Sequence, residues 1–344
     1  MKFIAIGELM LRLSPPNYEK IVTTHNFIVN YGGAEANVAV SLANLGVDST
    51  FFTVLPNTDL GKSCINYLKA NDVHTKHIIK SDGRMGLYYL EEGVSVRPSQ
   101  VIYDRGSSAF AEYDYKDVDF ENILKDYDWL HLSGITPALS YNCRRLIDKA
   151  IKAAKKYGTI VSYDLNYRPS MWSAIGGQEK AQEVNKEIAK YVDVMIGNEE
   201  DFTACLGFEI EGNDANLKTL NLDGYKKMIN EAAKTYPNFK AVATTLREVK
   251  TATVNDWSAI CWADGEIHKA KDYKGLEIMD RVGGGDSFAS GLIYGLMTTE
   301  DAELAVNYGA AHGALAMTTP GDTTMASKKE VEAIMGGAGA RVQR

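Results

Sequence analysis

The stretch Asp280–Leu292, DRVGGGDSFASGL, decides how the rest of this chain is interpreted. Three consecutive glycines, Gly283 to Gly285, leave their backbone N–H groups accessible to a ligand, because no Cβ shields them. Apolar residues at helical spacing follow from Phe288 to Ile293. The pattern predicts a glycine loop that leads into the N-terminus of a helix, where free amides and the helix dipole favour a bound anion.

Asp286 lies beside this predicted anion site. A carboxylate in that place can take the proton of a hydroxyl, while the amides of Gly283 to Gly285 stabilise charge on a phosphoryl group in transfer. The segment therefore predicts phosphoryl transfer to a hydroxyl, with Asp286 as general base. Taken alone, the segment fits a core helix that begins at glycine and binds no ligand equally well, because short glycine motifs are common.

Composition indicates the class of partner. The chain has 344 residues, of which 45% are hydrophobic and 24% are charged, with a formal net charge of -8. This length allows one large domain or two ordinary ones. An acidic chain is not expected to bind nucleic acid or an anionic membrane, since both select basic surfaces. A small molecule is the expected partner.

Cysteine spacing and the N-terminus indicate the compartment. Glu8 and Arg12 interrupt the apolar run at the start, so no signal peptide is expected, and no charge-free apolar stretch reaches the length of a membrane span. Neither a zinc site nor a disulfide framework is expected, because there is no CxxC pair among the widely separated cysteines Cys64, Cys143, Cys205 and Cys261. A reduced, cytoplasmic protein is predicted.

Alternating segments indicate the fold. Apolar runs predict strands over 3–6, 50–55, 129–132, 159–163, 192–196, 240–246, 251–255 and 258–263. Helical patterns predict helices over 34–45, 60–69, 141–157, 179–190, 222–235, 301–317 and 327–335, and one after Gly285. Regular βα order predicts a parallel, doubly wound sheet with helices on both faces.

Two β-rich segments interrupt this alternation. Residues 11–31 and 85–105 carry β-forming side chains and turn signals, including strand patterns at 87–90, 94–96 and 101–103. They predict one small accessory sheet. Residues 207–220 are predicted as a polar loop, and the glycine-rich tail from residue 336 as a flexible terminus.

Two motifs resemble the signatures of a known family. GGAEANVAVSLANLG at 32–46 and DRVGGGDSF at 280–288, in this order, resemble the two signatures of the ribokinase-like (PfkB) carbohydrate kinases. The resemblance extends over nearly the whole chain, with DLNYRPSMW at 164–172 and GNEED at 197–201. It implies a three-layer α/β/α sandwich with a mostly parallel central sheet and a small β-sheet lid. The implied body is 1–10, 34–84 and 108–335, the lid is 11–33 and 85–107, and the tail is 336–344.

Within this family the chain is most similar to the 2-keto-3-deoxygluconate kinases. The similarity lies in GELMLRL at 7–13, GLYYLEE at 86–92, VIYDRGSSA at 101–109 and TPGD at 319–322. It implies ATP-dependent phosphorylation of the terminal hydroxyl of 2-keto-3-deoxygluconate. The alternatives are a fructokinase- or ribokinase-like kinase of a neutral sugar, and a ligand-binding protein that keeps the fold without catalysis.

The resemblance also implies roles for individual residues around the sugar acid. Asp286 would be the base, and Arg168 would pair with the substrate carboxylate, which a bidentate arginine fork matches well. Arg12 replaces an aspartate that grips hydroxyls in many neutral-sugar kinases, so with Arg105 and Arg168 it predicts a positive pocket. The substrate-binding residues would be Gly33, Asn37, Tyr88, Tyr103, Arg105, Asn166, Arg168 and Asp286.

Some of these residues have plainer explanations. Arg105 and Arg168 could be arginines that form salt bridges between elements, the commoner role of an arginine. Tyr88 and Tyr89 alternate along a predicted strand, so only one of them can face a ligand. Tyr88 is the one predicted.

For the nucleotide, the resemblance implies contacts from Asn198, Thr245, Arg247, Gly283 and Gly285. Glu200 or Asp201 would organise Mg²⁺ through water, in keeping with the few protein ligands that this ion takes. The resemblance also allows for a monovalent cation. Because lid strands often pair between subunits in this family, a homodimer or higher homo-oligomer is expected.

Overall fold

The computed structural model describes residues 1–210 and 221–337. Most of the polar loop predicted over 207–220 and nearly all of the predicted tail therefore lie outside the described residues. Within the described residues, none of the helices combines the length and the apolarity that a membrane span requires.

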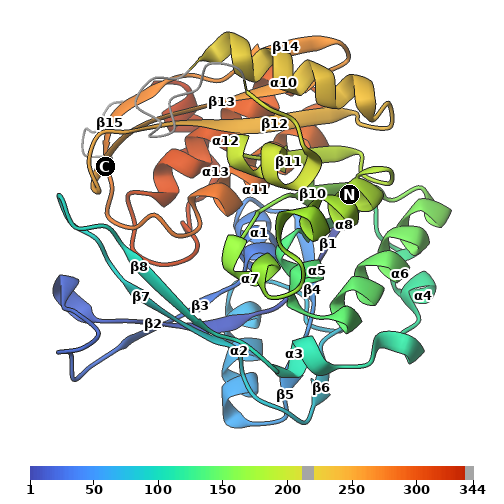
Figure 1. Cartoon of the computed structure of the whole chain (residues 1–344), viewed down its shortest axis with the longest axis vertical. Coiled ribbons are helices and arrows are strands. Elements are labelled where there is room, and N and C mark those ends of the chain that lie inside the picture. Colours follow the sequence, from blue (N-terminus) through green and yellow to red (C-terminus); the bar gives the residue numbers. More distant parts are fainter. Residues whose placement is uncertain (211–220, 338–344) are drawn as a thin grey trace.

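A large, mostly parallel sheet forms the centre of the molecule (Figure 1). Its order is β14-β13-β12-β11-β10-β9-β1-β4, and β15 pairs with β13. Neighbours from β4 to β12 are parallel, whereas β13, β14 and β15 pair in antiparallel fashion. The bounds are β1 Lys2–Ile6, β4 Asp48–Phe52, β9 Trp129–Ser133, β10 Ile160–Asp164, β11 Val194–Gly197, β12 Ala241–Val249, β13 Val254–Ala263, β14 Glu266–Lys269 and β15 Tyr273–Glu277.

Helices cover both faces of this sheet. One apolar cluster joins the sheet to α1 (Ala34–Asn44), α2 (Asp59–Ala70), α11 (Gly284–Thr299), α12 (Ala302–Ala316) and α13 (Lys328–Met335). A second cluster on the other face includes α3 (Ala109–Glu112), α4 (Phe120–Leu124), α6 (Tyr141–Tyr157), α8 (Gly177–Ala189) and α10 (Leu222–Thr235). The predicted three-layer α/β/α sandwich is confirmed.

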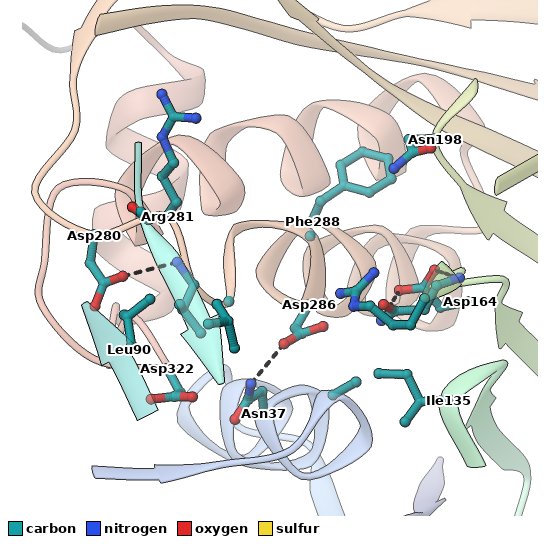
Figure 2. Close-up of a pocket in the computed structure, with 18 of the residues that line it drawn as sticks. Asn37, Leu90, Ile135, Asp164, Asn198, Asp280, Arg281, Asp286, Phe288 and Asp322 are labelled. Carbon is teal, nitrogen blue, oxygen red and sulfur yellow. Dashed lines mark hydrogen bonds between the residues drawn. The ribbon is translucent and has the colours of Figure 1, made fainter. Parts of the chain in front are cut away.

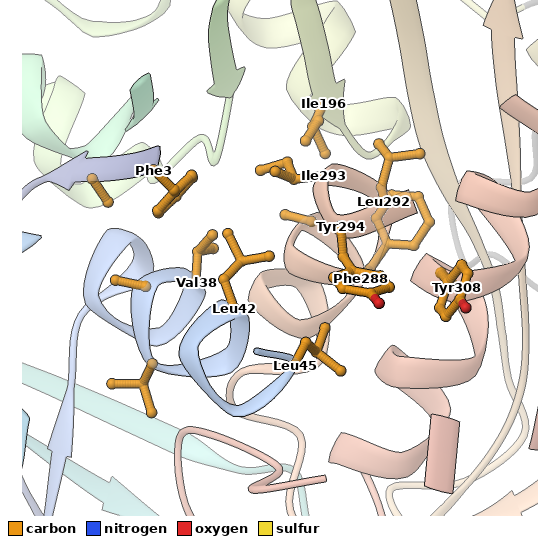
Figure 3. Packing of buried hydrophobic residues seen from close by; sticks show 14 of the residues in the cluster. Phe3, Val38, Leu42, Leu45, Ile196, Phe288, Leu292, Ile293, Tyr294 and Tyr308 are labelled. Atoms are coloured by element: carbon orange, nitrogen blue, oxygen red, sulfur yellow. The ribbon is translucent and has the colours of Figure 1, made fainter. Parts of the chain in front are cut away.

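Strand β1 explains why the central strands are apolar without interruption. Phe3 and Ala5 belong to the cluster of α1 and α11, part of which Figure 3 shows, whereas Ile4 and Ile6 belong to the cluster on the other face. Successive side chains of a strand point to opposite faces, so a strand covered on both sides must be apolar at every position.

The two β-rich segments form one separate sheet, as predicted. Its order is β3-β2-β7-β8, with β2 (Met10–Ser14), β3 (Ile28–Gly32), β7 (Leu87–Glu91) and β8 (Gln100–Asp104). We call these four strands the accessory sheet. Figure 1 shows it projecting from the body at the lower left.

Three of the predicted strands differ in the structure. Residues 50–55 divide between β4 and β5 (Val54–Pro56), and β5 pairs with β6 (Ile79–Ser81) in a small sheet of its own. The separate strand predicted over 251–255 is wrong, because β13 continues without a break from Val254. The strand pattern at 94–96 lies in the β7–β8 turn, where Val94 and Arg97 exchange backbone hydrogen bonds. β-forming side chains do not by themselves distinguish a strand from its turn.

Short helical segments lie mainly after the strands of the central sheet. They are η1 (Pro16–Tyr18), η2 (Tyr115–Asp117), α5 (Ile135–Leu139), α7 (Pro169–Ser173), α9 (Glu199–Asp201) and a π-helical turn (Phe202–Leu206). Of these, α5, α7 and α9 follow the carboxyl ends of β9, β10 and β11. The carboxyl edge of the parallel sheet is where open α/β folds bind their ligands.

Candidate active site

A pocket of about 500 Å³ opens at this edge, between the accessory sheet and the start of α11. Its walls come from distant parts of the chain: Gly33–Asn37, strands β7 and β8, and segments 164–168, 196–201, 245–252 and 278–286. Figure 2 shows side chains of these segments converging, with Asp286 between Asn37 and Asp164. The structure thus brings both signature motifs to one cavity.

Asp286 occupies the first turn of α11, on the pocket wall. Asn37 Nδ2 of α1 donates a hydrogen bond of 2.7 Å to Asp286 Oδ2 (Figure 2). Burial raises the pKa of Asp286 to about 7, although the hydrogen bond from Asn37 and the charge of Arg168 both lower it. A carboxyl group with this pKa exchanges protons readily near neutral pH, as a general base must.

The glycine loop leaves the start of α11 open to the pocket. Gly283 has φ +78°, and a Cβ there would lie 2.0 Å from the carbonyl oxygen of Asp322, so only glycine fits. Gly285 also lines the pocket, with nothing within 4 Å of the place where its Cβ would be. Gly284 instead faces Met317. Since no side chain caps α11, its N-terminal amides can bind an anion.

Arg168 enters the pocket from the loop after β10. Its Nη1 donates a hydrogen bond of 2.9 Å to the carbonyl oxygen of Tyr167. Within the part of the chain that the structure describes, Arg168 forms no ion pair with a carboxylate. Burial lowers the pKa of Arg168, yet Tyr103, Asp201 and Asp164 raise it further, so the guanidinium stays charged.

Asn166 and Asp164 shape the same loop. Asn166 lines the pocket with φ +38°, and its backbone N–H donates to Asp164 Oδ1 at 3.2 Å. Burial, with the charges of Asp201 and Asp286, raises the pKa of Asp164 well above its usual range. The sequence prediction did not include Asp164, although its place at the end of an apolar strand is a signal for a site at the sheet edge.

Arg105 lines the pocket, but most of its guanidinium is already engaged. Its Nε and Nη2 donate to Glu8 Oε2 at 2.8 and 2.5 Å, and Ser108 Oγ donates to the other oxygen of Glu8. Arg105 therefore forms a salt bridge between elements, which is the plainer of the two roles considered for it from sequence. Glu8 lies in the quoted GELMLRL motif, yet nothing local to that motif indicates its partner.

Arg12 does not reach the pocket wall, so the prediction that it makes the pocket positive is wrong. Its side chain is 1% exposed and forms ion pairs with Glu92, Asp280 and Asp322. Asp280 lies in the DRVGGGDSF motif and Asp322 in the TPGD motif, but neither motif indicates a role for these two carboxylates. Opposite charges that meet in the fold are hidden in a sequence when hundreds of residues separate them.

The two tyrosines of β7 separate as predicted for a strand. Tyr88 is buried, lines the pocket and donates a hydrogen bond to Asp322 Oδ1. Tyr89 does not line the pocket and packs edge-on against Phe27, with 5.8 Å between ring centroids. Tyr103 of β8 lines the pocket beside Tyr88, with 6.0 Å between their rings. Gly33 lies at the pocket too, where a Cβ would meet the carbonyl oxygen of Glu8 at 2.1 Å.

Asn198 and Asp201 hold each other at the start of α9. Asn198 Oδ1 accepts from the Asp201 N–H at 2.9 Å, and Asp201 Oδ2 accepts from the Asn198 N–H at 2.8 Å. Asp201 Oδ1 accepts from the Tyr167 N–H at 2.7 Å, so both oxygens of this carboxylate bind backbone. Glu199 lines the pocket, whereas Glu200 is exposed outside it.

The described residues contain no group of three acidic, histidine or cysteine side chains that could hold a metal ion by themselves. Mg²⁺ usually keeps several waters and binds through one or two carboxylates together with substrate phosphates. Asp201 and Glu199 at the pocket therefore suit an ion that arrives with a nucleotide better than one that the protein holds alone.

Thr245 and Arg247 of β12 line the far end of the pocket, together with Arg281. Arg281 Nε and Nη2 donate to the carbonyl oxygens of Ala252 and Thr251 at 3.0 and 2.9 Å. Burial and the charge of Arg247 lower the pKa of Arg281. Two neighbouring arginines that repel each other beside the glycine loop favour an anionic ligand here, and Arg281 was not predicted from sequence.

Comparison with known proteins gives consistent results. The profile of the pfkB family carbohydrate kinases matches residues 2–329. The chain is 32% identical to the 2-dehydro-3-deoxygalactonokinase of Haloferax volcanii over 100% of its own length and 99% of that protein. It is 28% identical to the 5-dehydro-2-deoxygluconokinase of Geobacillus kaustophilus, over 93% of this chain and 88% of that one. The crystal structure of the 2-dehydro-3-deoxygluconokinase from Thermotoga maritima is similar with a TM-score of 0.92 and 43% identity, and the match covers 98% of this chain and 100% of that one.

Proposed function

The chain belongs to the pfkB family of carbohydrate kinases, and we propose that it phosphorylates the terminal hydroxyl of a 2-keto-3-deoxy sugar acid. The first candidate is 2-keto-3-deoxygluconate, which is another name for the 2-dehydro-3-deoxygluconate of the Thermotoga maritima relative. The galactonate epimer, named for the Haloferax volcanii relative, is the second candidate.

One observation supports an acid substrate above all. Arg168 lies in the same pocket as Asp286, and among the described residues it has no carboxylate partner. An arginine fork binds a carboxylate through two parallel hydrogen bonds, and such bonds are stronger when both groups are charged. A sugar acid supplies the missing anion, whereas a neutral sugar does not.

Asp286 acts as the general base in this proposal. Its carboxylate takes the proton of the terminal hydroxyl, whose oxygen then forms a bond to the γ-phosphorus of ATP. The bond between the γ-phosphorus and its bridging oxygen breaks, and ADP leaves with the electron pair. Asn37 holds Asp286 Oδ2 and so fixes the direction of the base. A pKa of about 7 leaves Asp286 able to accept this proton near neutral pH.

The anion hole consists of the N-terminal amides of α11 around Gly283 to Gly285. They donate to the transferring phosphoryl oxygens as negative charge builds on them. Tyr88, Tyr103 and Arg105 from the accessory sheet side would cover the substrate. Gly33 and Asn166 would contact its oxygens from the body.

ATP with Mg²⁺ is the proposed phosphoryl donor, as for kinases of this family. Asn198, Thr245, Arg247 and the two pocket-lining glycines, Gly283 and Gly285, would contact the nucleotide. Mg²⁺ would be reached through water by Asp201 or its neighbours Glu199 and Glu200. Of these, Glu199 and Asp201 line the pocket.

A substrate panel tests the assignment. Purified protein is assayed for ADP release with 2-keto-3-deoxygluconate, its galactonate epimer, fructose and ribose. We expect kcat/KM for one of the acids to exceed that for either neutral sugar by at least tenfold. Preference for a neutral sugar would favour the fructokinase- or ribokinase-like alternative, and no turnover with any sugar would favour the non-catalytic one.

The accessory sheet supports a second part of the proposal, that it serves as a lid and as a dimer interface. Ile28 and Val29 of β3 and Val101 and Ile102 of β8 are exposed in the single chain. Both are edge strands of the accessory sheet, and exposed apolar patches are typical of interaction surfaces. Residues 11–33 and 85–107 would form this lid and the rest of the described chain the body. Light scattering at micromolar concentration should give the mass of a dimer or a higher homo-oligomer, and a monomer would contradict the interface.

A further inference from the structure

Arg12 of the accessory sheet contacts the body through acidic residues from two of its loops. Its Nη2 donates to Asp280 Oδ2 at 2.5 Å, and its Nη1 donates to Asp322 Oδ2 at 3.2 Å. Asp280 precedes the glycine loop and Asp322 follows α12, whereas Glu92, the third partner, belongs to the accessory sheet side. One buried guanidinium thus joins the accessory sheet to two loops of the body.

Asp280 also fixes the backbone of the anion hole. Its Oδ1 accepts a hydrogen bond from the N–H of Val282 at 3.0 Å, the residue before Gly283 (Figure 2). Its Oδ2, which Arg12 contacts, accepts a second bond from the N–H of Gly321 at 3.0 Å. The same carboxylate therefore ties Arg12 to the entry of the glycine loop and to the loop that carries Asp322.

Asp322 completes the connection. Its carbonyl oxygen packs against Gly283 so closely that no Cβ would fit, while its two carboxylate oxygens are held by Tyr88 and Arg12. The strand register places Arg12 of β2 directly beside Tyr88 of β7. Tyr88 lines the pocket. A ligand that moves β7 therefore also moves the contacts of Tyr88 and Arg12 with Asp322, whose carbonyl oxygen packs against Gly283.

We infer that Arg12 is a positioning residue that couples the accessory sheet to the anion hole, so that binding of the sugar under this sheet strengthens binding of the nucleotide. The inference rests on the proposed function for the identity of the sugar acid. In the structure Arg12 contacts Asp280 and Asp322 at the same time, and these two residues hold the backbone of the glycine loop. By thermodynamic linkage, the nucleotide must then strengthen binding of the sugar by the same factor.

The test measures that factor directly. The affinity of the β,γ-imido analogue of ATP with Mg²⁺ is determined by calorimetry, with and without saturating 2-keto-3-deoxygluconate. Coupling between sites typically changes an affinity about 5- to 150-fold. We expect wild type to fall within this range and Arg12→Met to lose the effect, while each ligand alone still binds.

Two further variants separate positioning from simple stabilisation. Arg12→Lys keeps the charge but not the planar fork that reaches two loops, so an intermediate factor is expected. This variant also decides the question if Arg12→Met does not fold. Lys155→Met removes an ion pair of 2.6 Å with the buried Asp193, which precedes β11 and does not line the pocket. It should keep the wild-type factor.

The inference is overturned if wild type shows no coupling, if the Arg12 variants keep it, or if Lys155→Met loses it equally. Failure of the proposed function gives a different result, because wild type would then bind no keto-deoxy acid. In that case the coupling is measured with the sugar that the substrate panel identifies.

Discussion

Two arginines near the same pocket have opposite surroundings. Arg12, between the accessory sheet and the glycine loop, has three carboxylate partners. Arg168, at the carboxyl end of β10, donates to a backbone carbonyl and forms no ion pair within the described residues. Arg12 is buried whereas Arg168 is half-buried, so the two side chains differ in exposure as well as in partners.

The difference lies in where each charge finds its partner. The ion pairs of Arg12 are complete within the protein, and its role there is to hold segments together. Arg168 stays charged and, among the described residues, has no carboxylate at ion-pair distance, so its guanidinium can bind an anionic ligand. A pocket arginine without a carboxylate partner is thus a better indicator of substrate charge than the number of arginines around a pocket.

Loss of Asp286 should have the largest effect on activity, because it removes the proposed general base from the pocket that Arg168 also lines. Asp286→Asn keeps the shape and the contact with Asn37 but cannot accept the proton. We expect kcat to fall by about 10²–10⁴, with little change in nucleotide affinity. Single-turnover kinetics and nucleotide titration measure both quantities. A variant that retains more than about a tenth of the activity would exclude Asp286 as the base.

Loss of Arg12 should mainly affect stability. Removal of one member of a buried ion pair costs about 3–5 kcal/mol, because the remaining charges stay buried without compensation. We therefore expect Arg12→Met to lower the free energy of unfolding by that amount and Arg168→Ala to lower it less. Urea-induced unfolding of the two variants and wild type measures the difference. Equal losses would mean that the two arginines have the same structural role.

Loss of Arg168 should mainly affect substrate choice. A hydrogen bond to a charged group contributes about 1.5–3 kcal/mol, so Arg168→Ala should lower kcat/KM for the sugar acid by about 10- to 150-fold. Residual activity on a neutral hexose should change much less, since that substrate has no carboxylate. Steady-state kinetics with both substrates test this selectivity. Equal losses on the two would remove the carboxylate contact from the proposal.

The pH dependence should show a smaller effect, from the same base. Burial raises the pKa of Asp286 to about 7, and the base is active only when ionised. Activity should therefore be full above this pH and decrease about tenfold for each unit below it. A profile of kcat/KM between pH 5 and 9 measures the apparent pKa, and the residual activity of Asp286→Asn should not follow the same curve. A profile that stays flat down to pH 5 would contradict the raised pKa.

Much of the fold could be predicted because its signals are local. Apolar runs such as residues 3–6 and the glycine loop before α11 depend on neighbours in sequence, and both are where they were expected. The two β-rich segments were also recognised by their composition. Short edge strands β14 and β15 were not predicted, because their half-exposed residues lack a clear alternating pattern.

The site could be predicted only in part. Asp286 and Asn37 follow from the two signature motifs, and the structure joins them by a hydrogen bond. The partners of Arg105 and Asp201 could not be predicted. Glu8 reaches Arg105 from another strand end, and a backbone N–H of the loop after β10 occupies the second oxygen of Asp201. Such contacts depend on how loops meet at the sheet edge.

The sequence by itself determined the βα alternation, the accessory strands, the glycine-entered helix and the family resemblance, because each depends on residue types at short spacing. Only the tertiary structure decided which arginine forms ion pairs with carboxylates and, among the described residues, which does not. Arg12 and Asp322 are 310 positions apart, and their contact exists because β2 and the loop after α12 pack together. The strength of an ion pair depends on distance and burial in space, and neither is encoded in local sequence pattern.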